Sequence, residues 1–261
     1  MIILGKSFYL EITYFHFFRL LYGKLAGMAH RLRDIVRWLP LRCRRIAEHI
    51  ISGLSAFSLA DKGIDLEKTN IARIAYWWAE FLVLTASLFG IAELYETLTD
   101  FIKFNTRPLT FWEKKLLHSI YGDSINYERV RIDNLSFVGP RQYRFCYVSF
   151  YTVNSWGSMS NHLLIHEMMH VYQYQTMGAL YIPRALAAQK SALGYNYGGL
   201  PALQKAKDNG QGLSAFNLEQ QAEIITDYYL LREGYKTQWS NALRFDLPLY
   251  EYFAEELRVE R

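Results

Sequence analysis

The chain has 261 residues, of which 51% are apolar and 21% charged. This balance excludes a disordered polypeptide and allows one large domain, or one domain with an appendage. The two cysteines lie far apart, so they predict neither a disulfide framework nor a cysteine zinc ribbon. The net charge is +4, yet residues 1–50 hold nine Lys and Arg against three acids, so that they carry +6 and the remainder carries −2. A basic segment of this kind points to an anionic partner, either lipid headgroups or nucleic acid.

Residues 1–104 are predicted to form a helical, basic and aromatic N-terminal region. Lys6 and Glu11 interrupt its apolar opening, and no small-residue cleavage site follows, so we predict no cleavable signal peptide. Residues 28–52 have the apolar spacing of a basic amphipathic helix that breaks or restarts at Pro40. Such a helix either docks on a membrane surface or packs as a solvated helix on the domain.

Residues 75–92 are the best candidate for a transmembrane segment. They reach the minimal length of about 18 residues, with a Trp pair near one end. Glu80 interrupts the segment, and the stretch without charge is too short to span a bilayer alone. A buried core helix and a membrane-associated hairpin therefore remain as alternatives.

A second unit, residues 105–261, is predicted to contain helix, strands and then helices, which indicates an α+β domain. A capping box at Thr110–Glu113 predicts a helix that ends at about 121–123. Residues 128–137 and 144–153 read as two strands joined by a turn at Gly139–Pro140.

Further helices are predicted in the rest of this unit. They cover residues from Ser160 or Asn161 to about 177, then 183–190, 217–231 and 248–258, whereas 194–200 and 205–212 read as loops.

The motif that carries chemistry is His166-Glu167-Met168-Met169-His170. Histidines at i and i+4 share one face of a helix, with Cβ atoms about 5–6 Å apart, which suits two imidazole ligands of one zinc ion. Glu167 lies about 100° further round the helix, where it can reach a water on the metal without being a ligand. This is the general-base position of zinc metallopeptidases with an H-E-x-x-H motif. The alternative is a pair of ordinary histidines on a core or surface helix.

A catalytic zinc site needs a third protein ligand and an open coordination position. The predicted helix 217–231 carries acids at four-residue spacing, and we choose Glu223 as the ligand. Asp227, one turn further, could hold a ligand histidine in its tautomer. Glu219 is the alternative ligand, because the repeat makes the register ambiguous. A solvated charged face is the simpler interpretation, but the flanking residues are largely apolar and a buried acid needs a partner.

Three other side chains lie near the motif in sequence. His162 is one turn before His166 and reads as a residue of the cap region or a support for the site. Tyr195 and Tyr197, in a glycine-rich loop, could donate a hydrogen bond to a developing oxyanion. Tyrosine is common throughout the chain, which favours a packing role for both over the role of donor.

Two stretches resemble zincin-like metallopeptidases of bacteria, found beside Vgr and Rhs elements and in extracellular contractile injection systems. The first runs from His162 through the motif to Gln175, and the second from Phe216 to Tyr229, while the leading segment 109–132 is also similar. The resemblance covers about residues 108–233. It implies a minimal zincin-like domain of glutamate-zincin type, in which His166, His170 and Glu223 bind Zn²⁺, Glu167 is the general base and Asp227 supports the site.

The predicted function is zinc-dependent hydrolysis of peptide bonds in a peptide or protein substrate. The edge strand near 144–153 would hold the substrate by β-augmentation. The alternatives are a non-enzymatic zincin module or toxin component of a secretion or contractile injection system, and a membrane-associated protein that uses residues 1–104. No nucleic-acid motif accompanies the basic segment. The location stays open among cytoplasm, membrane and secretion.

Overall fold

The computed structural model describes residues 3–60, 69–103, 105–137, 141 and 145–258. Two compact units divide the chain, Met1–Phe104 and Asn105–Arg261. The predicted turn at Gly139–Pro140 lies outside the described residues. Described helices and short strands together make a mixed fold, so the prediction of an α+β chain is confirmed.

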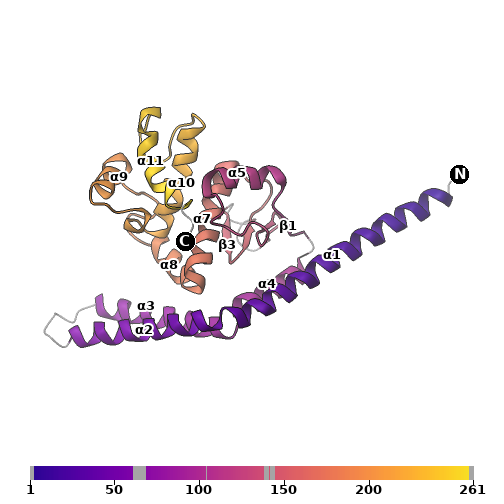
Figure 1. Cartoon of the computed structure of the whole chain (residues 1–261), viewed down its shortest axis with the longest axis horizontal. Coiled ribbons are helices and arrows are strands. Elements are labelled where there is room, and N and C mark those ends of the chain that lie inside the picture. Colours follow the sequence, from indigo (N-terminus) through magenta and orange to yellow (C-terminus); the bar gives the residue numbers. More distant parts are fainter. Residues whose placement is uncertain (1–2, 61–68, 104, 138–140, 142–144, 259–261) are drawn as a thin grey trace. The chain divides into compact units, whose positions relative to one another are not determined.

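The first unit is helical. Its elements are α1 (Ile3–Arg37), α2 (Leu39–Ala60), α3 (Thr69–Leu88) and α4 (Ile91–Ile102), with α1 packed on α4 and α2 on α3 (Figure 1). The predicted break near Pro40 falls at Trp38, and Pro40 occupies the first turn of α2, where its missing N–H costs no hydrogen bond.

Gly90 separates α3 from α4 and divides the transmembrane candidate 75–92. Its φ is +65°, and a Cβ there would come within 2.6 Å of Ile35 on α1, so the chain turns where only glycine fits. Among the described residues, no single helix is both long enough and apolar enough to cross a membrane. Arg73–Leu88 and Ile91–Ile102 pass that test only as a pair, bent by 68°.

The second unit begins with a small mixed sheet and helix α5 (Phe111–Tyr121). The described strands are β1 (Arg107–Pro108), β2 (Arg131–Asp133), β3 (Tyr147–Ser149) and β4 (Thr152–Asn154), in the order β1-β2-β4-β3. Strand β2 is antiparallel to β1 and parallel to β4, while β3 and β4 are antiparallel.

Two predictions for this sheet differ from the structure. The stretch 144–153 is not one strand, because Phe150 adopts φ +60° and reverses the chain between β3 and β4. The predicted strand 128–137 is reduced to the three residues of β2, and residues 107–108, where no strand was predicted, form the edge strand β1. The capping box before α5 is confirmed: Glu113 N–H donates to Thr110 Oγ1, and Thr110 N–H donates to the Glu113 carboxylate.

The remaining helices assemble around α7 (Asn161–Met177) and α10 (Leu218–Arg232), which pack on each other. The sequence prediction for both is confirmed, including the Asn217–Gln220 capping box that starts α10. They are joined by α8 (Tyr181–Gln189) and α9 (Gly199–Asp208), and α11 (Leu247–Glu255) packs on α10 (Figure 1). Short 3-10 turns lie at Gly178–Leu180, Leu213–Ala215 and Arg244–Asp246.

The prediction of a polar loop at 205–212 is wrong for its first part, which belongs to α9. Leu203 and Ala206 are buried, so this helix packs on the domain through its apolar face. Both α7 and α10 are buried on nearly all sides, so the acids of α10 lie inside the protein.

Candidate metal centre

Helix α7 presents both histidines of the motif to α10. His166 and His170 are buried, and their ring centroids lie 5.0 Å apart. Ligand atoms of His166, His170 and Glu219 all lie within 4.8 Å of one another, which is close enough for one metal ion. Two imidazoles and one carboxylate form the His₂Glu donor set that zinc accepts in catalytic sites.

Glu219 faces the same nitrogen of both rings. Its Oε2 lies 3.4 Å from His166 Nε2 and 3.3 Å from His170 Nε2. The other oxygen, Oε1, accepts a hydrogen bond of 2.9 Å from Gln189 Nε2 on α8. Burial raises the pKa of Glu219, but the two histidines outweigh it and hold the pKa below its usual value.

Glu223 lies on the opposite side of the His166 ring. Its Oε1 is 3.3 Å from His166 Nδ1, one turn of α10 away from Glu219. A carboxylate on Nδ1 fixes the proton there and leaves the Nε2 lone pair free for a metal. Burial lowers the pKa of His166, whereas Glu219 and Glu223 raise it, with a net value of about 10 in the absence of a metal.

Gln173 faces Nδ1 of His170, as Glu223 faces Nδ1 of His166. The sequence analysis did not assign this role to Gln173. Gln173 Nε2 donates to the Leu218 carbonyl at 2.9 Å, and a carbonyl can only accept, so the orientation of the amide is fixed. Gln173 Oε1, 2.8 Å from His170 Nδ1, must then accept a proton from that ring. His170 therefore also keeps its Nε2 lone pair towards Glu219. The signal in the sequence is the spacing of three residues on one helix face.

Glu167 is buried on α7 and its Oε2 has no hydrogen-bond partner. Burial raises its pKa above the usual value, although the positive charge of the two histidines acts in the opposite direction. Glu219 Oε2 and Glu223 Oε2 are also buried without a hydrogen bond. Buried carboxylate oxygens that accept no hydrogen bond are costly, so three of them beside two imidazoles fit a site that binds a cation.

Asp227 is not hydrogen-bonded to either histidine in the described structure. Its carboxylate accepts from the Tyr197 hydroxyl at 2.7 Å and from the backbone N–H groups of Gln238 and Trp239. Asp227 therefore holds the segment after α10 against the domain. The Tyr197 hydroxyl also bonds to Tyr250 at 2.7 Å, so it is engaged in this buried network.

Tyr195, by contrast, is partly exposed and its ring centroid lies 6.1 Å from that of His166. Burial, followed by the negative charge of Glu219, raises its pKa to about 12, so the phenol stays protonated and can donate. His162 bonds to Ser160 at the start of α7, as expected for a residue of the cap region.

Comparison with known proteins gives one partial similarity. Over 149 residues, 52% of this chain, it is 28% identical to the type VI secretion system spike protein VgrG2b of Pseudomonas aeruginosa. The aligned part is 14% of that protein, so the chain spans a small fraction of its relative. No family model matches the chain, and no solved structure matches it. The similarity supports the expected association with Vgr elements, while the zincin type of the domain stays a prediction.

Proposed function

We propose that residues 105–261 are a zinc-dependent metallopeptidase carried by a component of a bacterial secretion system. The observation that carries the proposal is the convergence of one ligand atom each from His166, His170 and Glu219 within 4.8 Å, beside the buried Glu167 carboxylate. The secretion-system part rests on the partial similarity to the spike protein VgrG2b.

In this proposal Glu219, the alternative ligand, binds the metal together with His166 and His170. Glu223, first chosen as a ligand, would instead orient His166 through Nδ1, since its nearer oxygen faces that nitrogen. Gln189 would hold Glu219 in place through its other oxygen. When bound, zinc would supply Lewis acidity that lowers the pKa of a water molecule and polarises a substrate carbonyl.

Glu167 would accept the proton of the attacking water and return it to the leaving amine. Its buried oxygen without a hydrogen-bond partner is available for that transfer. Tyr195 would donate a hydrogen bond to the carbonyl oxygen as negative charge develops there. Strand β3 is an edge strand and packs against α7, so an extended peptide could add to it by main-chain hydrogen bonds.

The test compares the wild-type protein with Glu167→Gln. Zinc content, measured by mass spectrometry, should stay near one ion per chain in both proteins. Peptide hydrolysis should fall by about 10²–10⁴-fold in the variant, because the proton acceptor is lost. His166→Ala should lose both zinc and activity, since it removes a ligand.

The second candidate function is a zinc-stabilised module of a secretion system with no turnover, which the partial VgrG2b similarity also fits. Stoichiometric zinc with no hydrolysis of a casein or proteome-derived peptide library would favour this function. Unchanged hydrolysis in Glu167→Gln would contradict the assigned mechanism.

A further inference from the structure

Helix α4 turns its polar face towards the other helices of the first unit and exposes its apolar face. Large apolar side chains are exposed along one stripe at helical spacing: Ile91, Leu94, Tyr95, Leu98 and Ile102. The opposite face carries Glu93, Glu96 and Asp100, of which Glu93 and Glu96 are buried. At about 100° per residue, these acids lie roughly 180° from the stripe. This is the reverse of a surface helix in a water-soluble domain.

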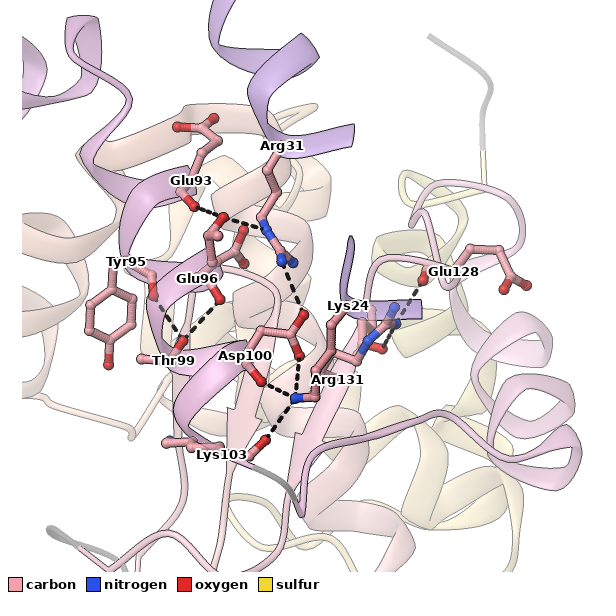
Figure 2. A network of polar contacts seen from close by, with 12 residues as sticks. Lys24, Arg31, Glu93, Tyr95, Glu96, Thr99, Asp100, Lys103, Glu128 and Arg131 are labelled. Carbon is pink, nitrogen blue, oxygen red and sulfur yellow. Dashed lines mark hydrogen bonds and ion pairs between the residues drawn. The ribbon is translucent and has the colours of Figure 1, made fainter. Parts of the chain in front are cut away.

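Two of these acids, Glu93 and Asp100, pair with basic residues of α1 and α2, and Figure 2 shows Asp100 with Lys24 and Arg31 of α1. Lys24 donates to the Asp100 carbonyl and to the Lys103 carbonyl, the latter at 3.1 Å. Arg31 bonds to the Asp100 carboxylate at 3.0 Å and to Thr97 at 2.8 Å.

Further along the same interface, Arg42 pairs with Glu93 and donates to the Ser87 carbonyl. The helices of this unit are therefore joined by charge-assisted hydrogen bonds between largely buried groups.

The described side chains of the first unit include very few buried apolar ones. Among its described side chains, at residues 18, 21–53 and 73–103, the buried apolar ones are Leu84 and Ala92. The buried polar ones are more numerous: Lys24, Arg42, His49, Glu80, Glu93 and Glu96. In water, such an assembly lacks the apolar burial that drives folding. In lipid, helices associate through polar contacts and keep ionisable groups inside, since the outside is already apolar.

Helix α1 also carries an exposed apolar stripe. Five exposed apolar side chains lie on this stripe: Phe18, Tyr22, Leu25, Leu32 and Val36. Arg33 and Arg37 are exposed about 60–100° round the helix from that stripe. The described acids of this unit are mostly buried or paired, so its exposed charge is mainly basic. An apolar stripe flanked by arginine is the pattern of a helix that lies at an anionic membrane surface.

We infer that α1–α4 form a membrane-inserting arm that binds bilayers containing anionic lipid. The outer stripes of α1 and α4 enter the acyl boundary, and Arg33 and Arg37 contact headgroup phosphates. We assign lipid, rather than a second copy of the chain or a groove of another protein, as the partner of these stripes. A bilayer accounts for the apolar stripes, the buried ion pairs and the flanking basic charge together. This function is independent of the proposed peptidase chemistry of residues 105–261.

The experiment is flotation of the full chain with vesicles of phosphatidylcholine and phosphatidylglycerol at 3:1. Leu94→Asn with Leu98→Asn should weaken binding by at least about a hundredfold, because two apolar side chains no longer enter lipid. The matched control is Leu186→Asn with Leu243→Asn in the other unit. These leucines are 52% and 59% exposed, against 50% and 61% for Leu94 and Leu98. The control should bind as the wild type does.

Arg33→Gln with Arg37→Gln tests the charge. Binding to the anionic vesicles should weaken by about thirtyfold, and raised salt should weaken wild-type binding, since each basic residue near the surface contributes to attraction. Wild-type binding to pure phosphatidylcholine should be correspondingly weaker. Far-UV circular dichroism of each variant reports whether the chain remains folded.

Two results would overturn the inference. One is failure of the folded wild-type chain to float with either vesicle. The other is equal loss of binding in the Leu94/Leu98 pair and the Leu186/Leu243 pair. Sedimentation without lipid distinguishes the alternatives: a dimer that Leu94→Asn with Leu98→Asn dissociates, together with no vesicle binding, would assign the stripe to a second copy of the chain.

Discussion

The third ligand of the proposed zinc site can be tested by comparing Glu219→Gln with Glu223→Gln. Both substitutions remove one buried negative charge from the same face of α10, so they differ mainly in geometry. Glu219 Oε2 lies 3.3–3.4 Å from the Nε2 atoms of both histidines, whereas Glu223 Oε1 lies 3.3 Å from Nδ1 of His166.

The expected loss of affinity follows from these positions. The free energy of zinc binding to a protein site is about 12 kcal/mol. Divided among four ligands, it amounts to about 3 kcal/mol for each, which corresponds to about 150-fold in Kd. Glu219→Gln should lose at least that much. After Glu223→Gln, an amide oxygen can still accept the proton on Nδ1, so the loss should stay below about tenfold.

Zinc affinity would be measured by competition with a chromophoric chelator, and metal content by mass spectrometry of the dialysed proteins. Thermal unfolding without metal serves as the control for folding. If Glu223→Gln lost zinc as strongly as Glu219→Gln, or more strongly, Glu223 would be a ligand and the geometric reasoning would be refuted.

Two further predictions concern positioning and pH. Gln173→Met should weaken zinc binding by about 10–100-fold, because Nδ1 of His170 loses its hydrogen-bond acceptor. It should also lower the free energy of unfolding by about 1–3 kcal/mol, because the Leu218 carbonyl loses its donor. Zinc affinity equal to that of the wild type would contradict the positioning role of Gln173. The hydrogen bond with Arg107 lowers the pKa of Glu113 from its ordinary value of 4.5 to about 2. The ionised carboxylate therefore stabilises the fold fully above pH 4.5, and this contribution disappears as the pH falls through about 2. Glu113→Gln should therefore cost about 1 kcal/mol at pH 7, after allowance for solvent screening, and the difference from wild type in urea unfolding should vanish near pH 2; a difference that grew on acidification would contradict this sign.

Local signals made much of the second unit predictable. Capping boxes at Thr110 and Asn217, together with the stop at Gly178, mark helix ends through contacts within one turn, so sequence alone can give them. The pairing of His166 with His170 is likewise set by helix geometry. The strands were harder, because Phe150 takes a positive φ that its residue type does not announce.

The sequence by itself determined which helix carries the two imidazoles and where the general-base candidate Glu167 stands on it. It left Glu219 and Glu223 as alternatives, since residues four apart share one face of a helix. Only the packing of α10 on α7 decided which carboxylate meets both Nε2 atoms and which meets Nδ1. The inverted arrangement of α4 was likewise invisible in sequence, because periodicity shows that a helix has two faces but not which of them another helix covers.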